Sequence, residues 1–411
     1  MQVVHSVCCG LDVHKRTVVA CLLIAAQGQP TKQLRTFGTT TRDLRELADW
    51  LEEHGCRQTA IESTGVYWKP VFNVLESRGI EVLLVNAQHI RNVPGRKTDA
   101  KDAEWIAELL QHGLLSASFV PPKEIRELRE LTRYRKTLIQ QRANQCNRIQ
   151  KLLETCNIKL ASVATDILGV SGREMLQALV EGDVDPERLA DVARGRLRNK
   201  IPQLVLALEG VLSDTQRWLL GEELLEIDRL EQAIARLDAK VEELTRPFAP
   251  MIEQLTQIPG ISRRVAEVIL AEIGVDMSRF PTANHLASWA GMCPGNRESG
   301  GKRQSGRSRG GNRWLQGVLT EAGWAAARTK DTALSAAYQR IARRRGAKRA
   351  CRAIGHRILL RVHLLLTLPE IEYRDPGPQY YQQRQHEQLK QQLLKKLREL
   401  GVEVTINDHA A

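Results

Sequence analysis

The sequence lacks any apolar segment that approaches the roughly 20 residues needed to span a bilayer. Its N-terminus also lacks the basic and then apolar pattern of a secretory signal. These two absences predict a soluble, cytoplasmic protein. With 411 residues, 42% of them apolar, the chain is long enough for two or three globular domains, each with a core of its own.

Paired cysteines of the CxxC type are also missing, and most of the eight cysteines lie inside apolar runs. Reduced cysteine in such a run behaves as a small hydrophobe. The pattern therefore argues against a zinc site and fits a reducing compartment. The cysteines are Cys8, Cys9, Cys21, Cys56, Cys146, Cys156, Cys293 and Cys351.

Acidic residues are scarce between Arg297 and Arg361, where three acids face seventeen lysines and arginines. This local excess of positive charge is larger than the net charge of +12 of the whole chain. Clustered cations gain affinity for polyanions because they release counterions from phosphate backbones. The segment therefore predicts a nucleic-acid-binding surface rather than a charge that serves solubility.

The N-terminal part of the chain alternates strand and helix patterns. Three strands with short connections come first, and helices alternate with strands after them. This is the order of an RNase H-like α/β fold. The expected strands are Val3–Val13, Thr17–Ala25, Gln33–Thr39, Thr59–Ser63 and Ile80–Val85, and the expected helices are Thr41–His54, Val66–Ser77 and Asp99–Gln111.

After Pro121 and Pro122 the pattern becomes almost entirely helical, with long helices expected at Glu124–Thr155 and Thr215–Leu244. Apolar residues in the second helix alternate in steps of three and four, as in a coiled-coil seam. The run is shorter than the heptad series that identifies a coiled coil, so a helix that faces the chain's own core stays open as an alternative. The seam residues are Ile227, Leu230, Ile234, Leu237, Val241 and Leu244.

Pro247 and Pro250 mark a second boundary, beyond which the basic segment begins. A tail from Asp375 ends in a helix rich in Gln and Lys that reaches Leu400 and is expected to be an appended helix or interaction arm. The domains predicted are an α/β domain at 1–118, a helical region at 119–248, a mainly helical basic domain at 249–368 and a helical tail at 369–411.

Carboxylates mark the ends of two predicted strands and the start of a helix. Asp12 closes the first strand and Glu62 the fourth, where a buried acid needs a basic partner or a metal ion to neutralise it. Asp99 and Asp102 begin the last helix three residues apart, which puts them on one face. Asp99 could instead cap that helix, and Asp102 could instead interact with its dipole.

In an RNase H-like fold the first and fourth strands are neighbours, and the last helix packs beside their ends. The four carboxylates are therefore expected to converge. Hard oxygen ligands suit Mg²⁺ or Mn²⁺, and two such ions about 4 Å apart can activate a nucleophile and stabilise a leaving oxygen at a phosphodiester. The set predicts metal-dependent phosphoryl transfer on nucleic acid.

Ser299 lies in a polar, glycine-rich loop where the following glycines allow a phosphate to approach closely. A hydroxyl is a weak nucleophile unless a base or a metal assists its deprotonation. No histidine is nearby in sequence, which favours assistance by the metal site. Taken alone Ser299 is a weak candidate, and Ser305 and Ser308 compete with it.

The segment Leu255–Ile261, followed by the apolar-periodic Val265–Leu270, is typical of a helix-hairpin-helix, although a plain helical turn is an alternative. Such a turn exposes backbone amides, here around Gly260, to a phosphate. Trp314 and Trp324 could stack on bases, but their spacing on one helix is more often that of core residues. The side chains expected to contact phosphates are Lys302, Arg303, Arg307, Arg309, Arg313, Arg343, Arg344 and Arg345, with Lys348 and Arg349 next to the last three.

These motifs together resemble the DEDD-type transposases of the IS110 insertion-sequence family and their relatives, the pilin-type DNA invertases. The resemblance rests on the acids in GLDVHK, IEST and KTDAKDA, on the PGI turn and on the PGNRESGGK loop. It covers the N-terminal domain and the segment from about Leu255 to Leu364, with no departure at the four acids or at Ser299. It implies a RuvC-like metal domain, a coiled-coil dimerisation region and a C-terminal transposase domain.

By this similarity Ser299 attacks a DNA phosphate to form a covalent phosphoserine, assisted by metal at Asp12, Glu62, Asp99 and Asp102. The similarity also implies recombination through a junction intermediate. An element-encoded bridge RNA would pair with donor and target DNA, and active sites would be built between the protomers of a dimer or tetramer. The expected location is the bacterial cytoplasm, on the nucleoid when the enzyme acts.

The residues alone leave two other functions open. One is a metal-dependent junction endonuclease, in which water attacks and Ser299 is structural. The other is a non-enzymatic nucleic-acid-binding protein whose carboxylates are structural. Loss of a covalent adduct in a Ser299 variant, and sensitivity to divalent metal, separate the three.

Overall fold

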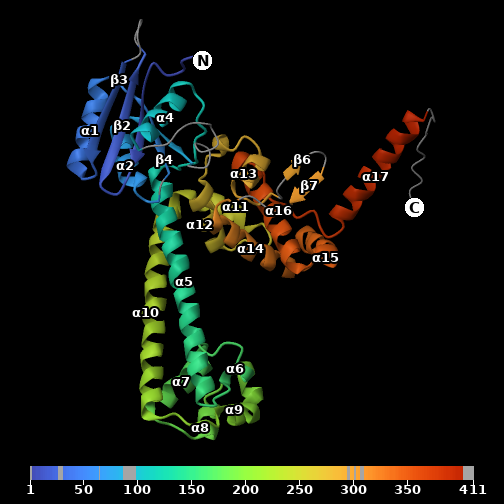
Figure 1. The fold of residues 1–411 in the computed structure, drawn as a ribbon. Helices are drawn as coiled ribbons and strands as arrows, with labels where there is room; N and C mark the ends of the chain where they lie inside the picture. The colour runs from blue at the N-terminus through green and yellow to red at the C-terminus, as the bar shows by residue number, and fades with distance from the viewer. Residues whose placement is uncertain are drawn as a thin grey trace. The chain divides into compact units, whose positions relative to one another are not determined.

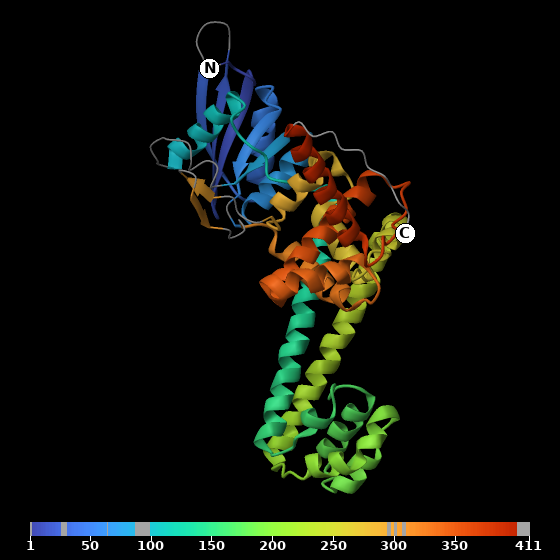
Figure 2. The ribbon, with the colours of Figure 1, turned by 90° about the vertical axis from the view of Figure 1, so that its right-hand side faces the viewer.

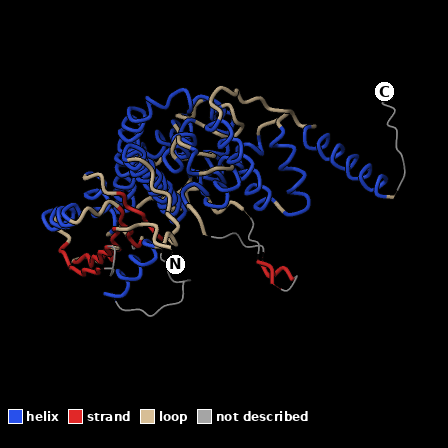
Figure 3. The backbone as a smooth tube through the Cα atoms, turned by 90° about the horizontal axis from the view of Figure 1, so that it is seen from above, coloured by secondary structure: helices blue, strands red, loops and turns tan. Residues whose placement is uncertain are grey.

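The structure is a computed structural model that describes residues 2–25, 31–63, 65–86, 99–293, 297–299, 302–305 and 310–400. The chain divides into two compact units, Met1–Val120 and Pro121–Ala411. The first contains a β-sheet with helices, and the second is almost entirely helical apart from one short hairpin (Figure 3).

A five-stranded sheet with the order β3-β2-β1-β4-β5 forms the centre of the first unit. The first three strands are antiparallel neighbours, whereas β4 runs parallel to β1 and β5 runs parallel to β4. This is the RNase H-like arrangement, which confirms the predicted fold class. The strands are β1 (Val7–Val13), β2 (Thr17–Ile24), β3 (Thr31–Gly38), β4 (Gln58–Glu62) and β5 (Glu81–Val85).

Helices cover both faces of this sheet (Figure 1). On one face lie α1 (Thr41–Glu53) and α2 (Trp68–Ser77), and on the other lies α4 (Asp99–Gln111). Helix α1 begins with a capping box in which the Thr40 hydroxyl accepts a hydrogen bond from the Asp43 amide and the Asp43 carboxylate accepts one from the Thr40 amide. Its apolar stripe then packs on the sheet.

One predicted boundary in this unit is wrong. The first strand begins at Val7 rather than Val3, because the amide of Val4 donates to the carbonyl of Gln111, at the end of α4, instead of pairing in the sheet. The side chain of Val4 is exposed. The other predicted elements are present with small shifts of their ends, and α4 has the predicted bounds.

Two long antiparallel helices, α5 (Lys123–Thr155) and α10 (Asp214–Thr245), lie side by side in the second unit (Figure 2). A small helical cap connects them at one end, and its buried residues share a core with both helices. The elements of the cap are α6 (Leu160–Val163), α7 (Val170–Glu181), α8 (Pro186–Asp191), the 3₁₀ helix η1 (Gly195–Lys200) and α9 (Ile201–Leu208).

The apolar seam of α10 is buried within the chain itself. Ile234 packs in one cluster with Leu138 of α5, and Val241 packs in another with Leu128. The core-facing alternative for this helix therefore holds, and the seam is not a free surface for a second protomer. The remaining seam residues, buried or partly buried in the same or adjoining clusters, are Ile227, Leu230, Leu237 and Leu244.

The rest of the second unit is a helical body in which α14 and α16 approach closely. A Cβ on Gly355 would lie 2.6 Å from the carbonyl oxygen of Leu319, so glycine is required at this crossing. The elements of the body are η2 (Arg246–Phe248), α11 (Ala249–Thr256), α12 (Arg263–Ile273), η3 (Met277–Arg279), α13 (Ala283–Trp289), β6 (Arg297–Ser299), β7 (Lys302–Ser305), α14 (Arg313–Arg328), α15 (Ala333–Arg345), α16 (Ala347–Thr367) and α17 (Tyr380–Glu399).

Among the helices that the structure describes, none combines the length and the apolar character needed to cross a membrane. All eight cysteines lie in the described ranges and are free thiols, most of them buried. Burial raises the pKa of Cys8 to about 12 and that of Cys56 to about 11. These thiols are therefore protonated at neutral pH and pack as small apolar side chains.

Candidate active site

Asp12 and Glu62 lie at the same end of two paired parallel strands. The register pairs Leu11 of β1 with Ile61 of β4, so the two acids are the next residue in each strand. Alternate residues of a strand share a face, and Ala60 packs in the cluster that includes α4. Asp12 and Glu62 therefore belong to the face of the sheet that α4 covers.

Helix α4 runs antiparallel to β1, with its first turn toward Asp12. A Cβ on Gly10 would lie within 3 Å of backbone atoms of Ala103 and Ala107, and the Cys8 thiol lies 3.7 Å from the carbonyl oxygen of Ala107. Moving along β1 from Cys8 toward Asp12 therefore means moving along α4 toward its start. Asp99 and Asp102 occupy that start.

The acids at this end of the sheet differ in burial. Asp12 is 7% exposed, and Nε2 of His14 lies 3.1 Å from its Oδ2. Glu62 and Asp102 are half-buried, whereas the side chain of Asp99 is outside the described residues. Among the described side chains, no three His, Cys, Asp or Glu residues are grouped closely enough to hold a metal ion. The hard carboxylate oxygens of the set are nevertheless the donor type that Mg²⁺ and Mn²⁺ prefer.

The close approach of α4 to Gly10 leads to a prediction. We expect Gly10→Ala to destabilise the first unit by about 1–3 kcal/mol, because the added methyl group collides with backbone rather than with a movable side chain. Gly317→Ala is the matched control, since Gly317 is an exposed position of α14 with nothing within 4 Å of an added Cβ. It should be stabilising by about 0.5–1 kcal/mol. Thermal unfolding midpoints that shift in the same direction would refute the packing argument.

Ser299 ends strand β6 of a two-stranded hairpin rather than lying in an open loop. It pairs with Lys302, the first residue of β7, so the serine is at the turn end of the hairpin. Ser305 is the last residue of β7. The side chains of both strands and residues 306–309, with Ser308, Arg307 and Arg309, lie outside the described residues. The same holds for the side chains of Lys302 and Arg303.

The two ends of the serine-containing segment meet at its base. A Cβ on Gly311 would lie 2.5 Å from the carbonyl carbon and oxygen of Ala290 and from the amide of Gly291. The Gln316 side chain donates to the carbonyl of Ala290 at 2.8 Å, and Arg352 donates to that of Gly291 at 2.7 Å. Helices α14 and α16 thus fix the point where the chain leaves the helical body and returns to it.

Helices α11 and α12 flank the turn for which a helix-hairpin-helix was predicted, an arrangement that a plain helical turn also has. Ser262 caps α12 by accepting a hydrogen bond from the amide of Val265. Gly260 has a φ of 91°, and a Cβ there would lie 2.7 Å from the amide nitrogen of Ala326 in α14. This glycine therefore has a packing role, and phosphate binding around it stays a prediction.

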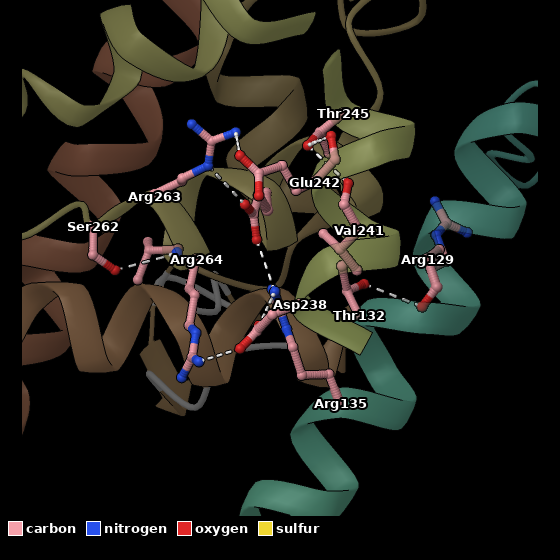
Figure 4. A network of polar contacts seen from close by, with 12 residues as sticks. Arg129, Thr132, Arg135, Asp238, Val241, Glu242, Thr245, Ser262, Arg263 and Arg264 are labelled. Carbon is pink, nitrogen blue, oxygen red and sulfur yellow. Dashed lines mark hydrogen bonds and ion pairs between the residues drawn. The ribbon is translucent and has the colours of Figure 1, made fainter. Parts of the chain in front are cut away.

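Sequence reasoning missed an ion-pair network that joins α5, α10 and α12 (Figure 4). Arg135 is 3% exposed and donates to Asp238 at 2.9 Å and to Glu267 at 2.8 Å. Arg263 and Arg264 at the start of α12 are paired with acids of the same network. The available signal was Glu267, an acid inside the apolar face of α12.

A cluster of five exposed basic residues lies where α15 ends and α16 begins. Arg343, Arg344 and Arg345 form the last turn of α15, and Lys348 and Arg349 belong to the first turn of α16. All five are exposed, as phosphate contact requires.

The two tryptophans of α14 have neighbours within the protein. The guanidinium of Arg313 lies 5.1 Å from the ring centroid of Trp314, and that of Arg133 lies 5.5 Å from it. Trp324 packs against Tyr338 with the ring centroids 6.0 Å apart. These contacts favour the packing interpretation of both residues over base stacking.

A histidine does lie close in space to the start of the segment that contains Ser299. Nε2 of His356 on α16 lies 4.0 Å from the Cys293 thiol, although the two are 63 positions apart in the chain. Burial and then the positive charge of Arg357 lower the pKa of His356, which favours the neutral form of its ring. No sequence pattern indicated this pair.

Comparison with known proteins adds two family matches. Residues 9–158 match a family of transposases of the DEDD IS110 type, and residues 252–339 match the transposase family IS116/IS110/IS902. The matched segments contain all four carboxylates and the serine hairpin. The unmatched stretch between them is made up mainly of the helical cap and α10.

Two relatives and one solved structure are similar to parts of this chain. The chain is 30% identical over 247 residues to the insertion element IS110 uncharacterized 43.6 kDa protein of Streptomyces coelicolor, across 55% of this chain and 60% of that protein. It is 23% identical over 310 residues to the pilin gene-inverting protein of Moraxella bovis, across 71% and 73% of the two chains. A solved structure of T. thermophilus RuvC in complex with a Holliday junction substrate matches 28% of this chain and 100% of that chain, with 11% identity and a TM-score of 0.21.

Proposed function

Because the chain belongs to the IS116/IS110/IS902 family of transposases, we propose that it is a DNA transposase that cuts and rejoins DNA by phosphoryl transfer. The observation that carries this proposal is the position of Asp12 and Glu62 at adjacent strand ends, on the face covered by the helix that begins with Asp99 and Asp102. A carboxylate as buried as that of Asp12 lowers the stability of the fold unless a partner or a bound metal ion neutralises its charge.

We assign metal binding to Asp12, Glu62, Asp99 and Asp102. A bound Mg²⁺ or Mn²⁺ would polarise a phosphate oxygen and stabilise charge on the leaving oxygen. His14 lies close enough to Asp12 to orient its carboxylate, which is a common role of a group behind a metal ligand. The close contact between α4 and Gly10 keeps the first turn of the helix beside the strand end.

We assign the nucleophile to Ser299. Its Oγ would form a bond to phosphorus as the bond from phosphorus to a sugar oxygen breaks, and the hydroxyl proton would leave while the released sugar oxygen takes up a proton. The phosphoserine keeps the energy of the original phosphodiester, so the hydroxyl of another strand can reverse the step. The position of Ser299 at the turn end of a short hairpin supports this role, because turn ends project from the body that carries them.

The proposed substrates are donor and target double-stranded DNA. The exposed arginines Arg343–Arg345 support binding to a polyanion, and the pilin gene-inverting relative supports rearrangement of DNA segments. Guidance by an element-encoded bridge RNA rests on the family resemblance. We further propose a dimer or tetramer that uses a surface other than the α10 seam, since α5 covers that seam.

An adduct assay tests this function. Purified protein is incubated with its element-flanking RNA, Mg²⁺ and end-labelled DNA that carries the element junction, and a denaturing gel resolves any protein–DNA adduct. We expect an adduct for the wild type and none for Ser299→Ala or Asp102→Asn. Cut DNA without an adduct, unaffected by Ser299→Ala, would identify a nuclease in which water attacks. Binding without any cutting, insensitive to metal, would identify a non-enzymatic binding protein.

A further inference from the structure

Asn312 occupies the point where the chain returns from the serine hairpin to the helical body. Its side-chain oxygen accepts hydrogen bonds from the amides of Trp314 and Leu315 at 3.0 and 3.1 Å, which caps α14. Its side-chain nitrogen donates to Oε2 of Glu272 at 2.5 Å. One side chain therefore fixes the start of α14 and also ties it to α12.

Glu272 is completely buried near the C-terminal end of α12. The helix dipole disfavours an acid at that end, and burial disfavours any carboxylate that is not neutralised. The neutralising charge comes from α5: Arg133 binds both carboxylate oxygens at 2.7 Å, and Arg129 lies 3.5 Å from one of them. A buried charge held at this cost suggests a role beyond stability.

Helix capping alone does not require asparagine at position 312. Serine or aspartate would cap α14 about as well. The amide of Asn312 accepts from two backbone amides through its oxygen and donates to Glu272 through its nitrogen, whereas an ionised aspartate has no donor and a serine has a single oxygen for both tasks. The choice of residue therefore follows from the combined demand of the helix start and the buried acid.

The neighbouring residue strengthens the geometric argument. A Cβ on Gly311 would lie 2.5 Å from backbone atoms of Ala290 and Gly291, where the segment that contains Ser299 begins. A shift of Asn312 therefore moves one side of a tight contact between the two ends of this segment. Such a shift would be passed to the β6–β7 hairpin that contains Ser299.

We propose that Asn312 and Glu272 are positioning residues for the serine hairpin. The proposal rests on the proposed function, because it assumes that Ser299 is the nucleophile. Neither residue is assigned a contact with the reacting atoms. Their effect arises because a misplacement of about 1 Å in a catalytic group is enough to cost about 100-fold in rate.

The test compares a single variant that adds a negative charge beside Glu272 with a double variant that restores the original net charge. Asn312→Asp keeps the cap but sets a second carboxylate against Glu272, and we expect it to slow formation of the protein–DNA adduct about 10–100-fold with unchanged DNA affinity. The double variant Asn312→Asp/Glu272→Gln restores one acid and one amide with their positions exchanged. Part of the lost rate should return, because a glutamine at position 272 can donate to the new aspartate but no longer accepts from both nitrogens of Arg133. Failure of the double variant to recover would overturn the proposal.

Two controls separate positioning from general damage. Thr332→Ala removes the cap of α15, which perturbs the start of a different helix in the same unit, and should leave the adduct rate unchanged. Hydrogen exchange of peptides covering β6 and β7 should become faster in Asn312→Asp and return toward the wild-type rate in the double variant. This readout needs no catalysis, so it tests the positioning role even where the wild type forms no adduct and the proposed function fails. Unchanged exchange in Asn312→Asp would overturn the proposal.

Discussion

Replacing Asp12 by asparagine is expected to lower DNA cleavage about a thousand-fold, because removal of a charged ligand costs several kcal/mol of metal-dependent transition-state stabilisation. The substitution keeps the shape of the side chain, so the sheet should stay intact. It also removes a charge that is only 7% exposed at the end of β1. We therefore expect the unfolding midpoint to stay near that of the wild type while activity collapses.

Initial cleavage rates in Mg²⁺, together with fluorescence anisotropy for DNA affinity, measure this prediction. Asp49→Asn is the matched control, since Asp49 is an exposed acid of α1 paired with Arg78, away from the strand ends. It should cleave at the wild-type rate. Wild-type cleavage by Asp12→Asn would mean that the acids at this end of the sheet are structural.

The second large effect is on stability. We expect Arg135→Met to destabilise the second unit by about 3–5 kcal/mol, because it leaves Glu267 buried and without its main partner. Arg263 lies 3.3 Å from the same carboxylate but is itself largely exposed, so it compensates only in part. Urea unfolding monitored by circular dichroism gives the free energy of unfolding.

The double variant Arg135→Met/Glu267→Met separates the loss of unfolding free energy caused by an unpaired buried charge from the net contribution of the ion pair to that free energy. One guanidinium nitrogen of Arg135 is buried without a hydrogen-bond partner, so the pair does not satisfy all its own groups. Replacement of both charges by apolar side chains of similar size is expected to recover most of the loss. If the loss of stability in the double variant equals the sum of the losses in Arg135→Met and Glu267→Met, the two residues act independently.

The sequence predicted the first unit well because local patterns and pairing rules agree there. The periodic Ala103, Ile106 and Ala107 after the acids of KTDAKDA place α4 with its actual bounds. The convergence of Asp12 and Glu62 follows from the parallel register of their strands, which the fold class already implies. The contact of Gly10 with α4 was not predictable, since it depends on the distance between helix and strand.

The second unit shows where the sequence is insufficient. The apolar steps of α10 specify a seam but not its partner, and the partner is α5 of the same chain. Arg135 and Glu267 are 132 positions apart, and no local pattern connects them. Ser299 was expected in an open loop because its strands are only three and four residues long, below the length at which alternation is recognisable.

The antiparallel pairing of α5 and α10 makes the pair an adjustable spacer. Each helix rises about 1.5 Å per residue, so seven residues added to both would lengthen the pair by about 10 Å and return the same faces to contact. The same insertion in one helix alone would shift the two registers against each other and misalign charged pairs such as Arg142 with Glu231. Length changes among relatives should therefore occur in both helices together, in steps close to seven residues. Such changes would alter the length of the α5–α10 pair without altering the structure at either end of it.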